Sequence, residues 1–303
     1  FDSLGFDTWG VDFGLLDTDG HLLANPVHYR DARTNGKPEQ AAACMPAEEL
    51  YAHTGNQIMA INTLFQLLAL QEQEPELLQK AEQILFMPDL FAALLGAEPV
   101  CERSIASTSQ MLDPRTGQWS REVLTAYGLK ENHFAPLVAS GTVTGTLTTG
   151  AKIIAVAGHD TQCASAAMPC AEEDAEHTAF LSCGTWSLLG VENAAAITGP
   201  DSCAANFTNE GGYEYRYRYL KNIMGLWMIQ SVRRELGEKT GTRPSFPELI
   251  AAAKEAADFP SCVDPDDNRF LAPASMIEEV RAACADTHQP VPAATGEVMQ
   301  CVY

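Results

Sequence analysis

Hydrophobic and polar residues follow two different rhythms along the chain, and together these rhythms predict an α/β protein. From about Pro38 to Ala97, apolar residues recur at intervals of three and four, the spacing of helices that bury one stripe. Short apolar runs separated by Gly-rich turns predict strands at the start of the chain and again after Ala151. The run IIAV at 153–156 leads into a small-residue stretch, which indicates a buried strand followed by a helix.

Two apolar segments of the chain resemble each other. DTWGVDFGLL at 7–16 and CGTWSLLGVE at 183–192 both carry a Thr-Trp pair at a predicted turn. The first segment belongs to a predicted pair of strands joined by the turn DTDG. The similarity between the two segments predicts two related α/β domains, which we place at residues 1–170 and 171–303. The chain begins as if within a sheet and ends as if within a helix, so we expect a fragment in which both domains are incomplete.

Composition narrows the class of protein. The 303 residues are 46% hydrophobic, which is typical of a globular chain, and they contain no apolar run long enough for a membrane helix. A net charge of -21, from 40 acidic and 19 basic residues, argues against nucleic acid or an anionic membrane as a partner. Nine cysteines without a CxxC pair predict free thiols, so we expect a soluble cytoplasmic protein.

The sequence GHDTQ places His159 and Asp160 directly after the predicted buried strand. Ligands of open α/β folds gather at the carboxyl ends of strands. Asp160 is therefore either the N-cap of the following helix or a carboxylate that takes a proton from a substrate hydroxyl, and both roles are compatible. His159 either orients the substrate or is merely packed. A thiol nucleophile formed by His159 and Cys163 is a third interpretation.

Other candidate residues have a plain structural interpretation beside the functional one. Thr185 lies at a turn whose backbone and hydroxyl groups can approach a phosphate, although ordinary hairpins have the same pattern. Asn222 and Gln230 are amides in an apolar context and are explained equally well as a helix cap and a solvent-facing side chain. Trp9 beside Gly10 suits either the floor of a sugar site or core packing.

Taken in order and spacing, nine segments resemble the FGGY carbohydrate kinases of the actin-like ATPase superfamily, and within them the rhamnulokinase branch. The likeness covers nearly the whole chain, and DTWGVDFGLLD with LKNIMGLW favours this branch over the xylulose, glycerol and fucose kinases. The segments are GFDTWGVDFGLLD, HYRDARTNG, NTLFQLLAL, LFMPDLFAALLG, STSQMLDPRTGQW, GHDTQCASA, SCGTWSLLGVE, NFTNEGG and LKNIMGLWMIQ.

The resemblance implies two ribonuclease H-like domains around a cleft and an ATP-dependent kinase of rhamnose catabolism. Its reaction would transfer the γ-phosphate of ATP to the 1-hydroxyl of L-rhamnulose, with Mg²⁺ bridging the ATP phosphates. Asp160 matches the family's catalytic base. The residues that match sugar contacts are Gly10, His159, Asp160, Thr161 and Asn222, and those that match nucleotide contacts are Thr185 and Gln230.

Departures from the family pattern leave alternatives open. The phosphate loop and the glycine-rich adenosine motif of the family would lie before Phe1 and after Tyr303, respectively. The chain is therefore either part of an active kinase or a sugar-binding fragment without turnover. A kinase of the same family acting on fuculose or xylulose is a further alternative. We expect a monomer or a homodimer.

Overall fold

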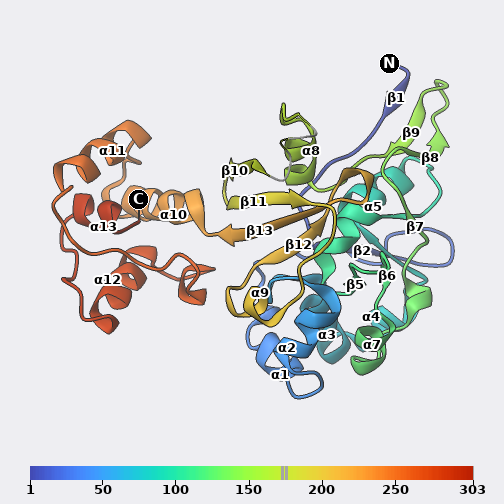
Figure 1. Cartoon of the computed structure of the whole chain (residues 1–303), viewed down its shortest axis with the longest axis horizontal. Helices are drawn as coiled ribbons and strands as arrows, with labels where there is room; N and C mark the ends of the chain where they lie inside the picture. Colours follow the sequence, from blue (N-terminus) through green and yellow to red (C-terminus); the bar gives the residue numbers. More distant parts are fainter. Residues whose placement is uncertain (172–173, 175–176, 303) are drawn as a thin grey trace. The chain divides into compact units, whose positions relative to one another are not determined.

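The computed structural model describes residues 1–171, 174 and 177–302 (Figure 1). The chain divides into two compact units. Unit 1 comprises Phe1–Phe180 and Gly190–Lys221, and unit 2 comprises Leu181–Leu189 and Asn222–Tyr303. Within the described part of the chain, no helix is long and apolar enough to span a membrane.

Helices and strands are interspersed along the chain, as expected of an α/β protein. The strands are β1 (Ser3–Leu4), β2 (Phe13–Leu16), β3 (Gln83–Phe86), β4 (Cys101–Glu102), β5 (Leu112–Asp113), β6 (Gln118–Trp119), β7 (Leu137–Val138), β8 (Thr142–Thr146), β9 (Lys152–Ala155), β10 (Ala179–Cys183), β11 (Ser187–Asn193), β12 (Thr208–Gly211) and β13 (Tyr217–Ile223). The α-helices are α1 (Lys37–Ala41), α2 (Ala47–Thr54), α3 (Thr63–Gln73), α4 (Pro75–Lys80), α5 (Met87–Leu94), α6 (Arg103–Ala106), α7 (Arg121–Ala126), α8 (Asp160–Ala166), α9 (Pro200–Ala204), α10 (Gly225–Thr240), α11 (Phe246–Glu255), α12 (Met276–Asp286) and α13 (Thr295–Val302).

Strand β9 confirms the strand expected at the apolar run IIAV. It is the middle strand of a three-stranded sheet in the order β1–β9–β8. It runs parallel to β1 and antiparallel to β8, so the sheet is mixed. A second sheet has the order β10–β11–β13–β12, in which β12 and β13 are antiparallel.

The helical region between Pro38 and Ala97 is confirmed for α1 to α5, but one part of it is a strand. Gln83–Phe86 forms β3, which pairs antiparallel with β2, so that Phe13 lies opposite Phe86. A four-residue apolar run fits a helix or a buried strand equally well, and here a partner some 70 residues away in the sequence decides between them.

The turn predicted after β2 is confirmed, whereas the strand predicted to follow it is not. Gly20 has a positive φ of 77°, and its N–H donates to the carbonyl of Asp17. Beyond the turn, only an isolated bridge joins Leu22 to Leu16. Pro26 lacks the N–H that a longer ladder would need, and the chain leaves the sheet.

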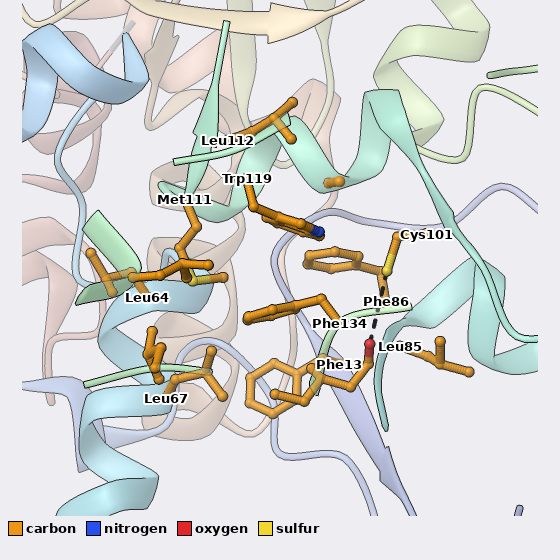
Figure 2. Close-up of a cluster of buried hydrophobic side chains, with 14 of the residues drawn as sticks. Phe13, Leu64, Leu67, Leu85, Phe86, Cys101, Met111, Leu112, Trp119 and Phe134 are labelled. Carbon is orange, nitrogen blue, oxygen red and sulfur yellow. Dashed lines mark hydrogen bonds between the residues drawn. The ribbon is translucent and has the colours of Figure 1, made fainter. Parts of the chain in front are cut away.

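Unit 1 contains a core of buried aliphatic and aromatic side chains contributed by helices and short strands (Figure 2). At its aromatic centre Phe86 stacks on Trp119, with ring centroids 6.4 Å apart, and Phe134 packs against Trp119 in a tilted arrangement at 4.5 Å. The Cys101 thiol in the same cluster donates to the carbonyl of Ile84. This core fixes β2, β3 and β4, and Glu102 of β4 contributes to the site described below.

Replacing Phe86 by Ala should destabilise the protein by about 3–5 kcal/mol, because a side chain with no exposed surface leaves a cavity in an aromatic stack. Urea unfolding followed by tryptophan fluorescence measures the loss. The matched control is Leu94→Ala at the end of α5, where the side chain is 53% exposed. We expect that control to change stability by less than about 0.5 kcal/mol. Equal losses in the two variants would contradict this description of the core.

Candidate active site

Two chain segments meet beyond the carboxyl end of β9. The N–H of Thr8 donates to the carbonyl of Gly158 over 2.9 Å, and the N–H of Asp160 donates to the carbonyl of Thr8 over 2.7 Å. These bonds extend the parallel pairing of β1 with β9 past the strand ends. They place the segment that contains Gly10 beside the segment that contains His159.

Asp160 is the first residue of α8, and its side chain is 60% exposed. Its Oδ1 accepts the backbone N–H of Thr161 at 2.6 Å and the Thr161 hydroxyl at 3.2 Å. His159 rather than Asp160 occupies the N-cap position, and its side chain makes no capping bond. Asp160 thus satisfies one of the unpaired N–H groups of the first turn while it presents a carboxylate to solvent.

The Nδ1 side of the His159 ring contacts a buried ion pair. Only 12% of its side chain is exposed, and Nδ1 lies 3.1 Å from Oε2 of Glu210. The same Oε2 accepts a hydrogen bond of 2.7 Å from Nη2 of Arg218. Nε2 of His159 lies 3.4 Å from Oδ1 of Asp160. The imidazole therefore links a buried charge pair to the exposed carboxylate.

Gly10 lies next to a strained turn. Val11 has a φ of 67°, which is unusual for a β-branched residue, and the N–H of Asp12 donates to the carbonyl of Gly10. Such a γ-turn costs on the order of 1–3 kcal/mol and persists only where its surroundings hold it. Here Thr63 donates its hydroxyl to the Val11 carbonyl, and Thr108 accepts the Val11 N–H.

Trp9 is not a core residue, because 40% of its surface is exposed. Its indole N–H donates to Oδ2 of Asp12 over 2.8 Å. Asp12 is buried and also accepts from the Tyr29 N–H and from the Gln66 amide. Burial raises the pKa of Asp12, and these donors oppose that shift. The arrangement fixes the plane of an exposed indole next to Gly10.

Glu102 joins the end of β9 to the start of α6 through hydrogen bonds. This carboxylate is 1% exposed and caps α6, where it accepts the N–H groups of Ser104 and Ile105 and the Ser104 hydroxyl. It also accepts the N–H of Gly158 at 3.2 Å and the hydroxyl of Ser140 at 2.7 Å. A Cβ on Gly158 would lie 2.8 Å from the ring of Pro88, so a larger residue does not fit there.

The geometry disfavours Cys163 as a nucleophile. Its thiol donates to the carbonyl of Ala157 at 2.9 Å. Burial, followed by the charge of Asp7, raises the pKa of Cys163 to about 11, so the thiol stays protonated at neutral pH. All nine cysteines are free thiols, as expected from the sequence.

The other predicted residues lie in unit 2. Asn222 is on β13, Thr185 is in the turn between β10 and β11, and Gln230 is on α10. The N–H groups of Leu226 and Trp227 at the start of α10 donate to the carbonyls of Gly184 and Thr185.

That turn and the helix come very close together. A Cβ on Gly225 would lie 2.1 Å from the Ser187 hydroxyl, so only glycine fits. The N–H of Gly184 bonds within the turn itself, while Thr185 and Gln230 are both exposed. The two nucleotide candidates thus belong to one turn–helix element.

The structure therefore forms two groups from the predicted residues. Gly10, His159, Asp160 and Thr161 come together in unit 1, and Thr185, Asn222 and Gln230 belong to unit 2. The sequence interpretation missed Glu102, Glu210 and Arg218. A usable signal existed for the last two, since Glu210 in NEGG and Arg218 in YRYRY are charged residues among small and aromatic ones.

The comparisons with known proteins agree with one another. The family model described as the FGGY family of carbohydrate kinases, N-terminal domain, matches residues 2–166, and the model for the C-terminal domain matches residues 179–303. The chain is 42% identical to a rhamnulokinase of Bacteroides thetaiotaomicron over 99% of its length, covering 62% of that relative. It is 41% identical to a rhamnulokinase of Oceanobacillus iheyensis over 99% of its length, covering 64% of that relative.

Solved structures show the same fold. A gluconate kinase from Lactobacillus acidophilus matches the whole chain and 61% of its own with a TM-score of 0.75 at 14% identity. A xylulose kinase from Rhodospirillum rubrum matches 99% of the chain and 61% of its own with a TM-score of 0.73 at 16% identity. The matches confirm the two-domain α/β kinase fold and the resemblance to rhamnulokinases. The chain spans 62% and 64% of the two curated relatives named above.

The buried carboxyl of Asp89 should give the stability a distinctive pH dependence. Asp89 in α5 is 5% exposed and accepts the N–H of Glu102, and burial raises its pKa well above the ordinary 3.8. As the pH rises past 3.8, the unfolded chain loses this proton while the folded protein keeps it, so folding stability falls. Asp89→Asn should remove that slope, which is at most about 1.4 kcal/mol per pH unit.

Urea unfolding at several pH values between 5 and 8 measures the free energy of unfolding of both proteins. The difference between Asp89→Asn and the unmodified protein should widen with pH, in favour of the variant. The exposed Asp258→Asn is the matched control and should follow the unmodified protein. A gap that stays constant with pH would show that Asp89 is ionised in the folded state.

Proposed function

The chain belongs to the FGGY family of carbohydrate kinases, and from this premise we propose that the complete protein transfers the γ-phosphate of ATP to the 1-hydroxyl of L-rhamnulose. Two relatives that are 41–42% identical are named rhamnulokinase. The observation that carries the proposal is the exposed carboxylate of Asp160, held at a helix start beside the anchored ring of His159.

In the proposed mechanism, Asp160 is the general base. Its Oδ1 is occupied by the N–H and hydroxyl of Thr161, so Oδ2 is the oxygen that takes the proton. As the sugar hydroxyl oxygen bonds to the γ-phosphorus, its O–H bond breaks towards Asp160 and the bond to ADP breaks on the opposite side. A base placed within the transition state avoids the cost of forming a free alkoxide at neutral pH.

The remaining predicted residues take binding roles in this proposal. Gly10, His159, Thr161 and Asn222 contact the sugar, while Thr185 and Gln230 contact the nucleotide. The exposed face of Trp9, fixed by Asp12, suits stacking against the C–H groups of a sugar. Cytoplasmic location and a monomeric or homodimeric state remain predictions.

Magnesium fits this site only with help from the nucleotide. Among the described residues, the one group of three potential metal ligands is Asp17, Asp19 and His21, in the turn after β2. Asp160 is not part of it. Mg²⁺ commonly binds through one or two carboxylates together with substrate phosphates, so ATP would supply most of its ligands here. When bound, the ion would neutralise charge on the transferring phosphoryl group.

Asp160→Asn in the complete protein should lower kcat by about 10²–10⁴-fold with little change in KM, because the amide keeps its bond to Thr161 but accepts no proton. ADP release in the presence of L-rhamnulose measures this. Asp201→Asn is the matched control, since Asp201 is also an exposed carboxylate in the first turn of a short helix. A nearly unchanged kcat in Asp160→Asn would exclude Asp160 as the base.

A panel of L-rhamnulose, L-fuculose, D-xylulose and glycerol tests the substrate. We expect kcat/KM for L-rhamnulose to exceed the others by about tenfold or more, the effect of one unpaired polar group in the site. Preference for another ketose would keep the kinase and change its substrate. Binding without turnover of any of them would instead support the sugar-binding alternative.

A further inference from the structure

Glu210 and Arg218 form a buried charge pair that no part of the proposed mechanism uses. They lie directly opposite each other on the antiparallel strands β12 and β13. Their side chains are 7% and 0% exposed, and Oε2 of Glu210 lies 2.7 Å from Nη2 of Arg218. Nε and Nη1 of Arg218 have no hydrogen-bond partner among the described residues. Glu210 is therefore the counter-charge on which this guanidinium depends.

This pair determines which ring nitrogen of His159 carries the hydrogen. Nδ1 of His159 lies 3.1 Å from Oε2 of Glu210 and 3.2 Å from Nη2 of Arg218. A guanidinium only donates, and a carboxylate only accepts. When Nδ1 carries the hydrogen, Nδ1 and Nη2 both donate to Oε2 and lie beside each other as two donors. Without that hydrogen, Nη2 could donate to Nδ1, but the lone pair of Nδ1 would then face the carboxylate oxygen Oε2 at 3.1 Å, so the carboxylate favours the hydrogen on Nδ1. In the neutral ring Nε2 is then an acceptor.

The acceptor Nε2 faces a second acceptor. It lies 3.4 Å from Oδ1 of Asp160, whose side chain is 60% exposed, whereas that of His159 is 12% exposed. Oδ1 already accepts from the N–H and the hydroxyl of Thr161, so a donor for Nε2 must come from another group. Sugar hydroxyls are such donors, and neighbouring hydroxyls of one sugar can reach neighbouring acceptors.

We propose that Glu210 and Arg218 are positioning residues that fix His159 with its hydrogen on Nδ1, so that Nε2 accepts a hydrogen bond from a sugar hydroxyl next to the reacting one. This inference rests on the proposed function, because it assigns the sugar hydroxyl that donates a hydrogen bond to His159. It adds the charge pair and the direction of the hydrogen bond.

The tautomer is measured directly by ¹⁵N NMR of the complete protein with labelled histidine at pH 8, with the His159 signals identified by their loss in His159→Ala. We expect a protonated Nδ1 and an unprotonated Nε2. A hydrogen on Nε2, alone or together with one on Nδ1, would overturn the proposal. This readout needs no turnover, so it tests the inference even if L-rhamnulose proves not to be the substrate.

A double-mutant cycle tests the coupling with whichever ketose the protein phosphorylates. Glu210→Gln should raise KM for the sugar about tenfold when His159 is present and by less than about twofold in the His159→Ala background. Equal effects in both backgrounds would show that Glu210 does not act through His159.

The change at Glu210 leaves Arg218 buried without a counter-charge and can unfold the protein, so a paired variant is needed. Glu210→Gln with Arg218→Met removes both charges, and KM should remain raised because Nδ1 still lacks a carboxylate. Recovery of the original KM in this pair would make the role merely structural. The control is Glu192→Gln on β11 of the same sheet, which breaks the partly exposed pair with Arg216 and should leave KM unchanged.

Discussion

The carboxylate of Glu102 is the contact on which the candidate site most depends. Taking a carboxylate out of water costs several kcal/mol unless its lone pairs are satisfied, and Glu102 accepts hydrogen bonds from Ser104, Ile105, Ser140 and Gly158. The two backbone segments that it joins, the start of α6 and the end of β9, are far apart in the sequence. Because Gly158 immediately precedes His159 and Asp160, the position of the candidate base follows from this buried anion.

Strain and burial around the site are consistent with that dependence. Val11 is held in a γ-turn by the hydroxyls of Thr63 and Thr108, and the ring of His159 is held by a charge pair from β12 and β13. The strained turn and the buried charge pair each cost free energy that a purely structural segment would avoid. The groups they leave exposed are the indole of Trp9 and the carboxylate of Asp160. Rigid support of the Asp160 carboxylate is what its proposed role as a base requires.

Much of the architecture was predictable because it is local. The helices of the Pro38–Ala97 region follow from the periodicity of their apolar residues, and the strand at IIAV follows from its apolar run and the small-residue stretch after it. The strand β3 was not predictable in this way, because its identity depends on pairing with β2. The same holds for the segment after Gly20, where the sequence suggested a strand that found no partner beyond one bridge.

By itself, the sequence determined the family, the α/β class and the residues at the end of β9, since these are written in short motifs and in their order. Only the tertiary structure decided that Asp160 stands just inside α8 rather than at its cap, that Trp9 lies outside the core, and that Cys163 is an inert thiol. It alone brought Glu210 and Arg218 against His159. The reason is physical: burial, charge pairing and hydrogen-bond direction depend on neighbours in space, and those neighbours come from distant parts of the chain.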